Sequence, residues 1–128
     1  MAPDFLSLAE VLEIHRDQIE RYGGKSGIRD MGLLQSALAM PAAGFGSRYL
    51  HSDLFEMAAA YLFHIVRNHP FVDGNKRTGA VAALVFLSLN GIEIEAGEDL
   101  FEQTVRAVAE GNMDKSAITR FFRQHLAG

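Results

Sequence analysis

The stretch His69-Pro70-Phe71-Val72-Asp73-Gly74-Asn75-Lys76-Arg77-Thr78 leads directly into an almost wholly apolar run from Gly79 to Leu89. The apolar run predicts a helix that is buried on all sides. Because the residue before a proline avoids the helical region, His69-Pro70 ends an earlier helix, and the polar stretch is a loop between two helices. Polar side chains of a catalytic type are costly to gather at the start of a buried helix for packing alone. The stretch therefore predicts a functional site.

Helix signals on both sides of this stretch indicate an all-α fold. Ser7 and Glu10 have the spacing of a capping box, and Asp30 and Asp53 are suited to cap two further helices. We expect one domain over residues 1–128, a compact bundle of six or seven helices around the buried helix that begins near Asn75. The predicted helices cover residues 8–22, 31–40, 54–68, 75–89, 98–110 and 114–126.

Residues 41–52 form the longest stretch without helical or strand periodicity. Gly44 and Gly46 flank Phe45, and Arg48 and Tyr49 follow shortly after. Flexible glycines beside such side chains suit a flap that closes over a site or grips a partner. An ordinary surface loop explains the same residues equally well.

The composition limits the classes of function. A formal charge of −4 argues against binding to DNA, which needs a cationic surface. There are no cysteines, which excludes disulfides and thiolate catalysis. The N-terminus lacks the pattern of a signal peptide, and the apolar run is too short to cross a membrane. We therefore expect a cytoplasmic protein.

The residue types in the central stretch suit a bound polyphosphate. The first N–H groups of a helix have no partner within the helix, and with the helix dipole they attract anions. Gly74 lets the main chain approach a ligand closely. Lys76 and Arg77 add two cations at this helix end. Cations there oppose the helix dipole, and a sequence normally avoids that arrangement unless an anion is held at the site.

Two further side chains suggest catalysis on that phosphate. Asp73 could bind Mg²⁺, which typically uses one or two carboxylates together with phosphate oxygens. Its alternative role is a simple helix N-cap. His69 could accept a proton from a hydroxyl nucleophile, although a histidine before a proline is more often a capping or packing residue. By contrast, His15 lies on the apolar side of its helix and is expected to be a half-buried packing residue.

The sequence HPFVDGNKRTG resembles the signature HxFx[DE]GNGRxxR of the Fic superfamily, and more closely its death-on-curing (Doc) branch. Residues 27–38, Arg67-Asn68 and the end of the apolar run also resemble that branch. The resemblance implies that His69 is the general base, that Asp73 binds Mg²⁺ and that Phe71 fixes the loop in the core. It also implies that phosphates are bound by Gly74, Asn75 and Arg77, and Lys76 is expected to add its charge to the same phosphate site.

Two departures from the AMP-transferring members favour the Doc branch. Lys76 replaces a glycine and Ala80 replaces a second arginine, so a nucleotide should not bind in the pose for AMP transfer. The resemblance then implies a toxin that uses ATP and Mg²⁺ to transfer the γ-phosphoryl group to a threonine of elongation factor Tu. AMP transfer, a catalytically silent binding module and a histidine-based metallohydrolase are the alternatives.

Members of this superfamily are usually restrained by a helix with the motif [ST]xxxE[GN]. The Glu-Gly pair of this chain is Glu110-Gly111, and Arg106 occupies the position of the Ser or Thr. We therefore expect restraint by a separate antitoxin, whose disordered tail folds as a helix into an apolar groove near the site.

Overall fold

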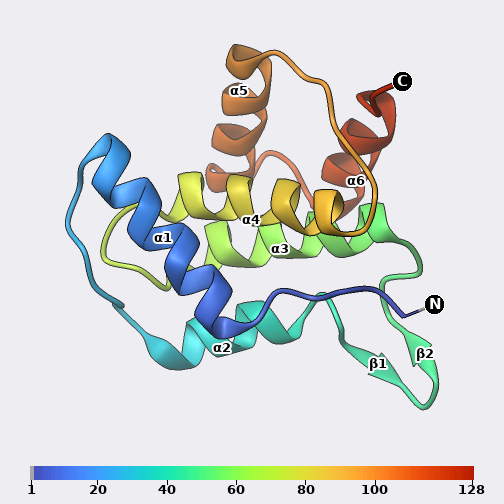
Figure 1. Cartoon of the computed structure of the whole chain (residues 1–128), viewed down its shortest axis with the longest axis horizontal. Helices are drawn as coiled ribbons and strands as arrows, with labels where there is room; N and C mark the ends of the chain where they lie inside the picture. Colours follow the sequence, from blue (N-terminus) through green and yellow to red (C-terminus); the bar gives the residue numbers. More distant parts are fainter. Residues whose placement is uncertain (1) are drawn as a thin grey trace.

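The computed structural model describes residues 2–128, which form six helices and one short hairpin (Figure 1). This confirms the predicted all-α fold, and the predicted helix ends agree with the observed ones to within two residues. In chain order the elements are α1 (Leu8–Tyr22), α2 (Met31–Ala39), β1 (Gly44–Phe45), β2 (Arg48–Tyr49), α3 (Leu54–Asn68), α4 (Asn75–Leu89), α5 (Glu98–Ala109) and α6 (Lys115–Gln124).

Helices α1, α2 and α3 each begin where a side chain accepts a hydrogen bond from one of their first N–H groups. The Ser7 hydroxyl accepts a hydrogen bond from the Glu10 N–H (3.1 Å), and the Glu10 carboxylate accepts one from the Ser7 N–H (2.8 Å). Asp30 and Asp53 accept bonds from N–H groups three residues later, at 2.9 and 2.8 Å. All three predicted caps are therefore confirmed.

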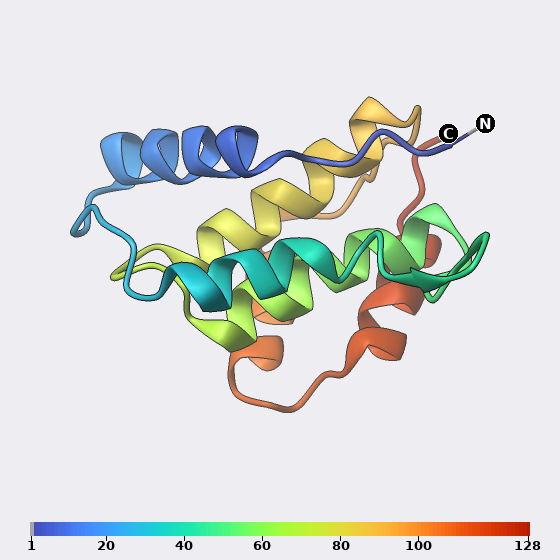
Figure 2. The ribbon, with the colours of Figure 1, turned by 90° about the horizontal axis from the view of Figure 1, so that it is seen from below.

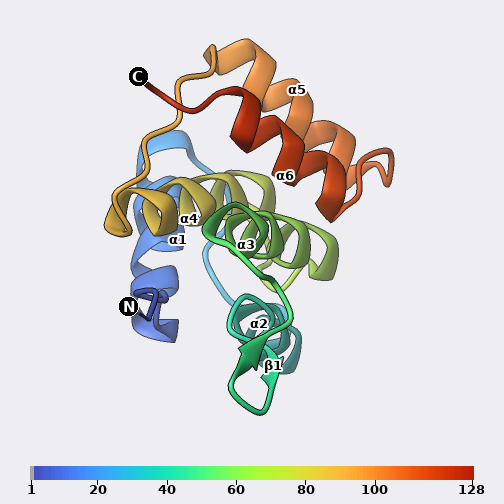
Figure 3. The same cartoon turned by 90° about the vertical axis from the view of Figure 1, so that its right-hand side faces the viewer.

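Helices α3 and α4 together form the middle layer of the molecule. Helices α5 and α6 cover one side of this pair, and α1, α2 and the hairpin lie on the other (Figure 3). Helix α3 is the more deeply buried of the two, with an unbroken buried run from Met57 to Leu62. The apolar run predicted that helix α4 is buried on all sides, and this is wrong. Val81 and Leu84 are half-buried and line an open groove.

The hairpin β1–β2 lies at the far end of α3 from His69 (Figures 1 and 2). Helix α3 has 15 residues, which corresponds to roughly 22 Å at the usual rise of an α-helix. The hairpin therefore cannot close over the predicted site, and that expectation for residues 41–52 is wrong. Phe45 at its tip is 94 % exposed, so the other expectation, that this loop contacts a partner, stays a prediction.

Within residues 2–128, we find no helix with both the length and the apolar character that a membrane span requires.

A cluster of three basic side chains joins α3 to α6. The Lys115 ammonium donates to Nε2 of His51 (3.3 Å) and to Nε2 of His64 (3.1 Å). Both imidazoles must be neutral to accept these bonds. Burial, and then the charge of Lys115, lower the pKa of His64 to about 4 and also lower the pKa of His51.

This cluster should make the fold sensitive to acid. The folded pKa of His64 is below its unfolded value, so its contribution to stability is complete above about pH 6.5 and declines as the pH falls toward 4. Because His64 is partly exposed, we expect a loss of about 1 kcal/mol, or a few degrees in Tm. In His64→Gln, Tm should fall less between about pH 7 and pH 5 than in the wild type. Equal slopes in thermal unfolding would contradict this.

Candidate active site

The loop between α3 and α4 is held in shape by Asn75. Its side-chain oxygen accepts a bond from the Phe71 N–H (2.9 Å), and its amide donates to the Phe71 carbonyl (3.0 Å). Both residues are buried. Phe71 is 1 % exposed, so its side chain holds this part of the loop against the core. The Asn75 side chain is occupied, so only its main-chain N–H is left to face a phosphate.

His69 stands at the exposed end of α3 in a left-handed backbone conformation, with φ 49°. Within residues 2–128 it is the one non-glycine residue with a positive φ. Such a conformation is costly for a residue with a Cβ and persists where its surroundings enforce it. Arg29 helps to do so, because its guanidinium donates to the carbonyls of His69 (2.6 Å) and Asn68 (3.0 Å). The imidazole is thereby presented to solvent from a fixed main chain.

Helix α4 begins without a side-chain cap. Gly74 occupies the N-cap position with φ 78°, and no side chain of residues 2–128 bonds to the first N–H groups from this position. A Cβ at Gly74 would lie 3.1 Å from the Ile19 side chain, so only glycine fits here without a shift. The predicted anion site at this helix end therefore has free donors.

Asp73 lies beside these donors and is exposed. One carboxylate oxygen accepts a bond from the Gly74 N–H and the other from the Lys25 N–H, both at 3.2 Å. A Cβ at Gly24 would come within 3.0 Å of the same carboxylate. Asp73 is thus oriented by main-chain donors and does not act as the N-cap, which was its alternative role.

A magnesium ion could be held only in part by the protein. No group of three His, Asp or Glu side chains suited to a metal occurs in residues 2–128. Asp73 offers an exposed carboxylate whose two bonds are long, so further lone pairs are accessible. This fits Mg²⁺ bound through one carboxylate together with phosphate oxygens, rather than a site made by the protein alone.

His15 supports the loop from α1, which its sequence position did not reveal. Its ring stacks on Phe71 with centroids 3.8 Å apart and planes 6° from parallel. Its Nε2 donates to the Asp73 carbonyl over 2.8 Å. His15 is buried, as a packing residue should be, but it also fixes the turn from which α4 starts.

The segment between α1 and α2 runs along the loop like a second strand. Ile28 forms an antiparallel bridge with Phe71, and the Val72 N–H donates to the Gly27 carbonyl (3.0 Å). The Pro70 carbonyl accepts bonds from the N–H groups of Arg29 and Asp30. This segment, and not the hairpin at residues 44–49, therefore borders the candidate site.

The two neighbouring cations lie in different environments. The Arg77 guanidinium donates to the carbonyls of Gly23 (2.9 Å) and Gln18 (3.4 Å) and lies over the Tyr22 ring. Lys76 is exposed and forms no ion pair within residues 2–128. Arg77 is thus attached to the end of α1 through two of its five N–H donors, which leaves the other donors available to a phosphate.

Comparison with known proteins agrees with this arrangement. The Fic/DOC family model matches residues 5–87. The chain belongs to the Fic/DOC family. It is 34 % identical to the protein kinase doc of Escherichia phage P1 over 119 residues, which are 93 % of both chains. It is 39 % identical to the toxin Doc of Mycolicibacterium smegmatis over 99 residues, which are 76 % of both chains.

This Fic/DOC protein has an open groove beside the start of α4, between α1 and α5. Its volume is about 570 Å³. Apolar side chains make up its floor, and charged groups, including Lys76 and Arg77, stand at its edges. The apolar lining residues are Ala80, Val81, Leu84, Phe101 and Val105.

Replacing His15 should loosen the loop between α3 and α4, which is called the catalytic loop below. His15→Phe keeps a ring on Phe71 but leaves the Asp73 carbonyl without its donor, which should cost about 1–2 kcal/mol of unfolding free energy. His15→Ala also removes the buried ring and should cost about 3–4 kcal/mol. Urea denaturation measures both. Glu20→Gln, on the exposed side of the same helix, is the control, and His15→Phe as stable as the wild type would contradict the assignment.

Proposed function

We propose that this protein is the toxin of a toxin–antitoxin pair and transfers the γ-phosphoryl group of ATP to a hydroxyl of a translation protein. The observation that carries the proposal is the exposed His69 beside the uncapped start of α4, with Asp73 and Lys76 next to it. The similarity to a protein kinase doc and a toxin Doc supports the same activity. Elongation factor Tu is the target that the family resemblance implies.

In the proposed reaction His69 accepts the proton of the target hydroxyl. The hydroxyl oxygen forms a bond to the γ-phosphorus, the bond from that phosphorus to the β–γ bridging oxygen breaks, and ADP leaves. The free N–H groups of α4 and the Lys76 ammonium stabilise the negative charge on the phosphates. Asp73 would hold Mg²⁺, which would supply further positive charge beside the phosphates.

Lys76 and Ala80 favour γ-phosphoryl transfer over AMP transfer. Lys76 places a long, exposed cation where AMP-transferring members have a glycine, and a nucleotide diphosphate would have to share that space. Ala80 lines the groove with a methyl group where those members have an arginine, so one phosphate contact is missing. AMP transfer nevertheless uses the same base and the same metal site, and it is the alternative that experiment must separate.

Incubation with ATP labelled on either the α- or the γ-phosphate separates these reactions. With purified elongation factor Tu, we expect label on the target from the γ position only. His69→Ala should reduce transfer by about 100-fold or more. His125→Ala, which changes the histidine that follows α6, should leave it unchanged. Lys76→Gly should reduce it by about tenfold.

Other results would point to the alternatives. Label from the α position alone would identify AMP transfer. Growth arrest that persists in His69→Ala and Asp73→Asn, with no label from either position, would identify a binding module without catalysis.

We further propose that the antitoxin inserts a helix into the groove between α1 and α5. The groove is apolar on its floor and charged at its edges, which suits one face of an amphipathic helix. Arg77 and Lys76 stand at the end nearest the catalytic loop, so an inserted helix would lie against both cations. Restraint by a separate protein is consistent with the lack of the inhibitory sequence motif around Glu110-Gly111.

A charged residue on the groove floor should release the toxin from its antitoxin. In cells that also make the antitoxin, Leu84→Glu should restore growth arrest, because a carboxylate in an apolar contact costs about 2 kcal/mol or more of binding. Leu89→Glu, at the far end of the same helix, is the matched control and should stay neutralised. If the antitoxin still neutralises a Leu84→Glu protein that retains phosphotransferase activity, the groove assignment is contradicted.

A further inference from the structure

A second pocket, of about 680 Å³, lies between α6 and the start of α3 and shares no residue with the catalytic loop. Seven of its eight lining residues have polar or charged side chains, and five of the eight lie on α6. The pocket is lined by Leu50, His51, Glu56, Lys115, Ser116, Thr119, Arg120 and Arg123. Its volume is in the range of sites for small organic ligands.

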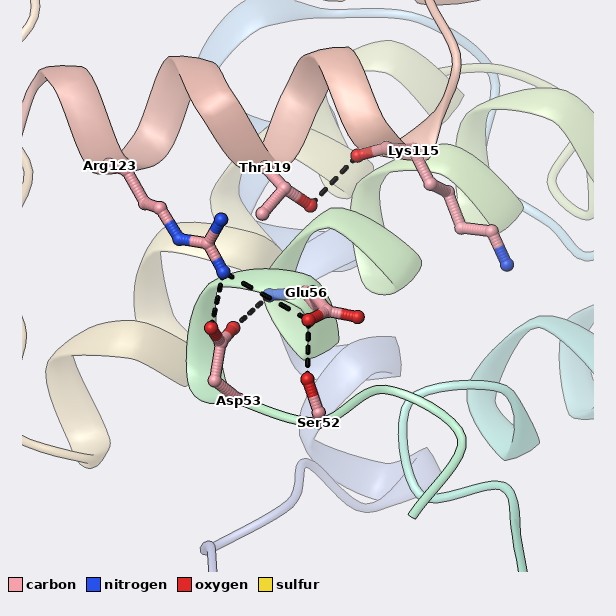
Figure 4. Close-up of polar contacts among 6 residues, drawn as sticks. All are labelled: Ser52, Asp53, Glu56, Lys115, Thr119 and Arg123. Carbon is pink, nitrogen blue, oxygen red and sulfur yellow. Dashed lines mark hydrogen bonds and ion pairs between the residues drawn. The ribbon is translucent and has the colours of Figure 1, made fainter.

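One end of the pocket holds a cluster of one cation and two carboxylates. Arg123 forms ion pairs with Asp53 and Glu56, and the Ser52 hydroxyl donates to Glu56 over 2.6 Å (Figure 4). The Thr119 hydroxyl donates to the Lys115 carbonyl over 2.8 Å, within α6. The charged groups of Glu56, Asp53 and Arg123 are therefore paired with one another.

The other end carries positive charge without a counter-ion. The Lys115 ammonium donates to the two neutral imidazoles of His51 and His64 and lies over the Phe63 ring, 5.9 Å from its centroid. It forms no ion pair within residues 2–128. Arg120, a little more than one turn further along α6, is exposed and likewise forms no ion pair in the described chain. In a protein with a formal charge of −4, two such neighbouring cations facing one pocket are an uncommon concentration of positive charge.

We propose that this pocket binds a small phosphomonoester, with the phosphate between Lys115 and Arg120. Arginine suits bidentate contact with phosphate oxygens and lysine supplies a point charge, while the Ser116 hydroxyl is an additional donor at the same end. The cluster of Arg123 with Asp53 and Glu56 offers polar groups of both signs to the uncharged part of the ligand.

The two histidines make this binding depend on pH. Burial lowers the pKa of both His51 and His64, and the charge of Lys115 lowers it further. An anion beside Lys115 offsets that charge and stabilises the protonated imidazoles, whereas Arg120 and Arg123 oppose protonation and Glu56 and Asp53 favour it. Binding should therefore take up protons and grow stronger as the pH falls.

Inorganic sulfate is a suitable first probe, because it stays a dianion across this pH range while phosphate does not. At constant ionic strength, titration followed by NMR of the His51 and His64 rings and the Lys115 and Ser116 amides should saturate with a Kd of about 1 mM or lower near pH 5.5. The affinity should be about threefold or more weaker near pH 7.5. Shifts that do not saturate, or that show no pH dependence, would mean an adventitious ion only and would overturn the proposal.

Variants separate this pocket from general attraction to cations. Lys115→Met and Arg120→Gln should each weaken binding by about tenfold. Arg16→Gln removes the same charge from the exposed side of α1 and should have no effect. Arg120 is exposed, so its replacement should not affect folding even where that of Lys115 does. Unchanged affinity in Arg120→Gln would overturn the proposal.

A comparison of two phosphate sources tests the size of the ligand. Glycerol phosphate should bind at least as tightly as sulfate, and a peptide that contains phosphoserine should bind more weakly, because the pocket is bounded by α3 and α6. A peptide that binds more tightly than glycerol phosphate would overturn the assignment to a small molecule.

Discussion

The pair of hydrogen bonds between the Asn75 side chain and the main chain of Phe71 is the constraint on which the candidate site depends. These bonds close the loop between α3 and α4 within the core, so the polar groups of the loop are placed by buried contacts. On one side His15 stacks on Phe71 and holds the Asp73 carbonyl. On the other side, the segment before α2 pairs with the loop, and Arg29 holds the end of α3. The site is therefore rigid where its functional groups emerge.

This rigidity is combined with unsatisfied groups at the mouth of the site. The start of α4 has no side-chain cap, and His69 adopts a costly backbone conformation at the exposed end of α3. The other α-helices that begin at Ser7, Asp30, Asp53 and Asp114 are capped by those side chains. Helix α5 also starts without a side-chain cap, at Gly97, whereas the uncapped start of α4 lies beside a strained histidine. That combination is consistent with selection for ligand binding rather than for stability.

Local signals in the sequence were sufficient for the helices and for the composition of the central loop. Caps such as Ser7 and Asp53, and the stop at His69-Pro70, act over a few residues and can be recognised from spacing alone. The contacts of His15 with Asp73 and of Arg77 with Gly23 join residues more than 50 positions apart, and no periodicity reveals them. The position of the hairpin could not be predicted for the same reason. Its glycines predict a turn, but they do not predict which end of α3 that turn occupies. The cluster around Lys115 also depends on how α3 and α6 pack.

The environments of Lys76 and Arg77 explain why two adjacent cations can occupy a helix start, where each opposes the helix dipole. Arg77 reaches the carbonyls at the end of α1, where a positive charge is favourable, so the fold itself offsets its unfavourable position. Lys76 has no such compensation, because it is exposed and forms no ion pair in residues 2–128. A residue whose charge is unfavourable in the free protein is stabilised when an anion arrives. Lys76 is therefore the side chain at this helix start whose presence the proposed phosphate binding best explains, whereas Arg77 also has a structural reason to be there.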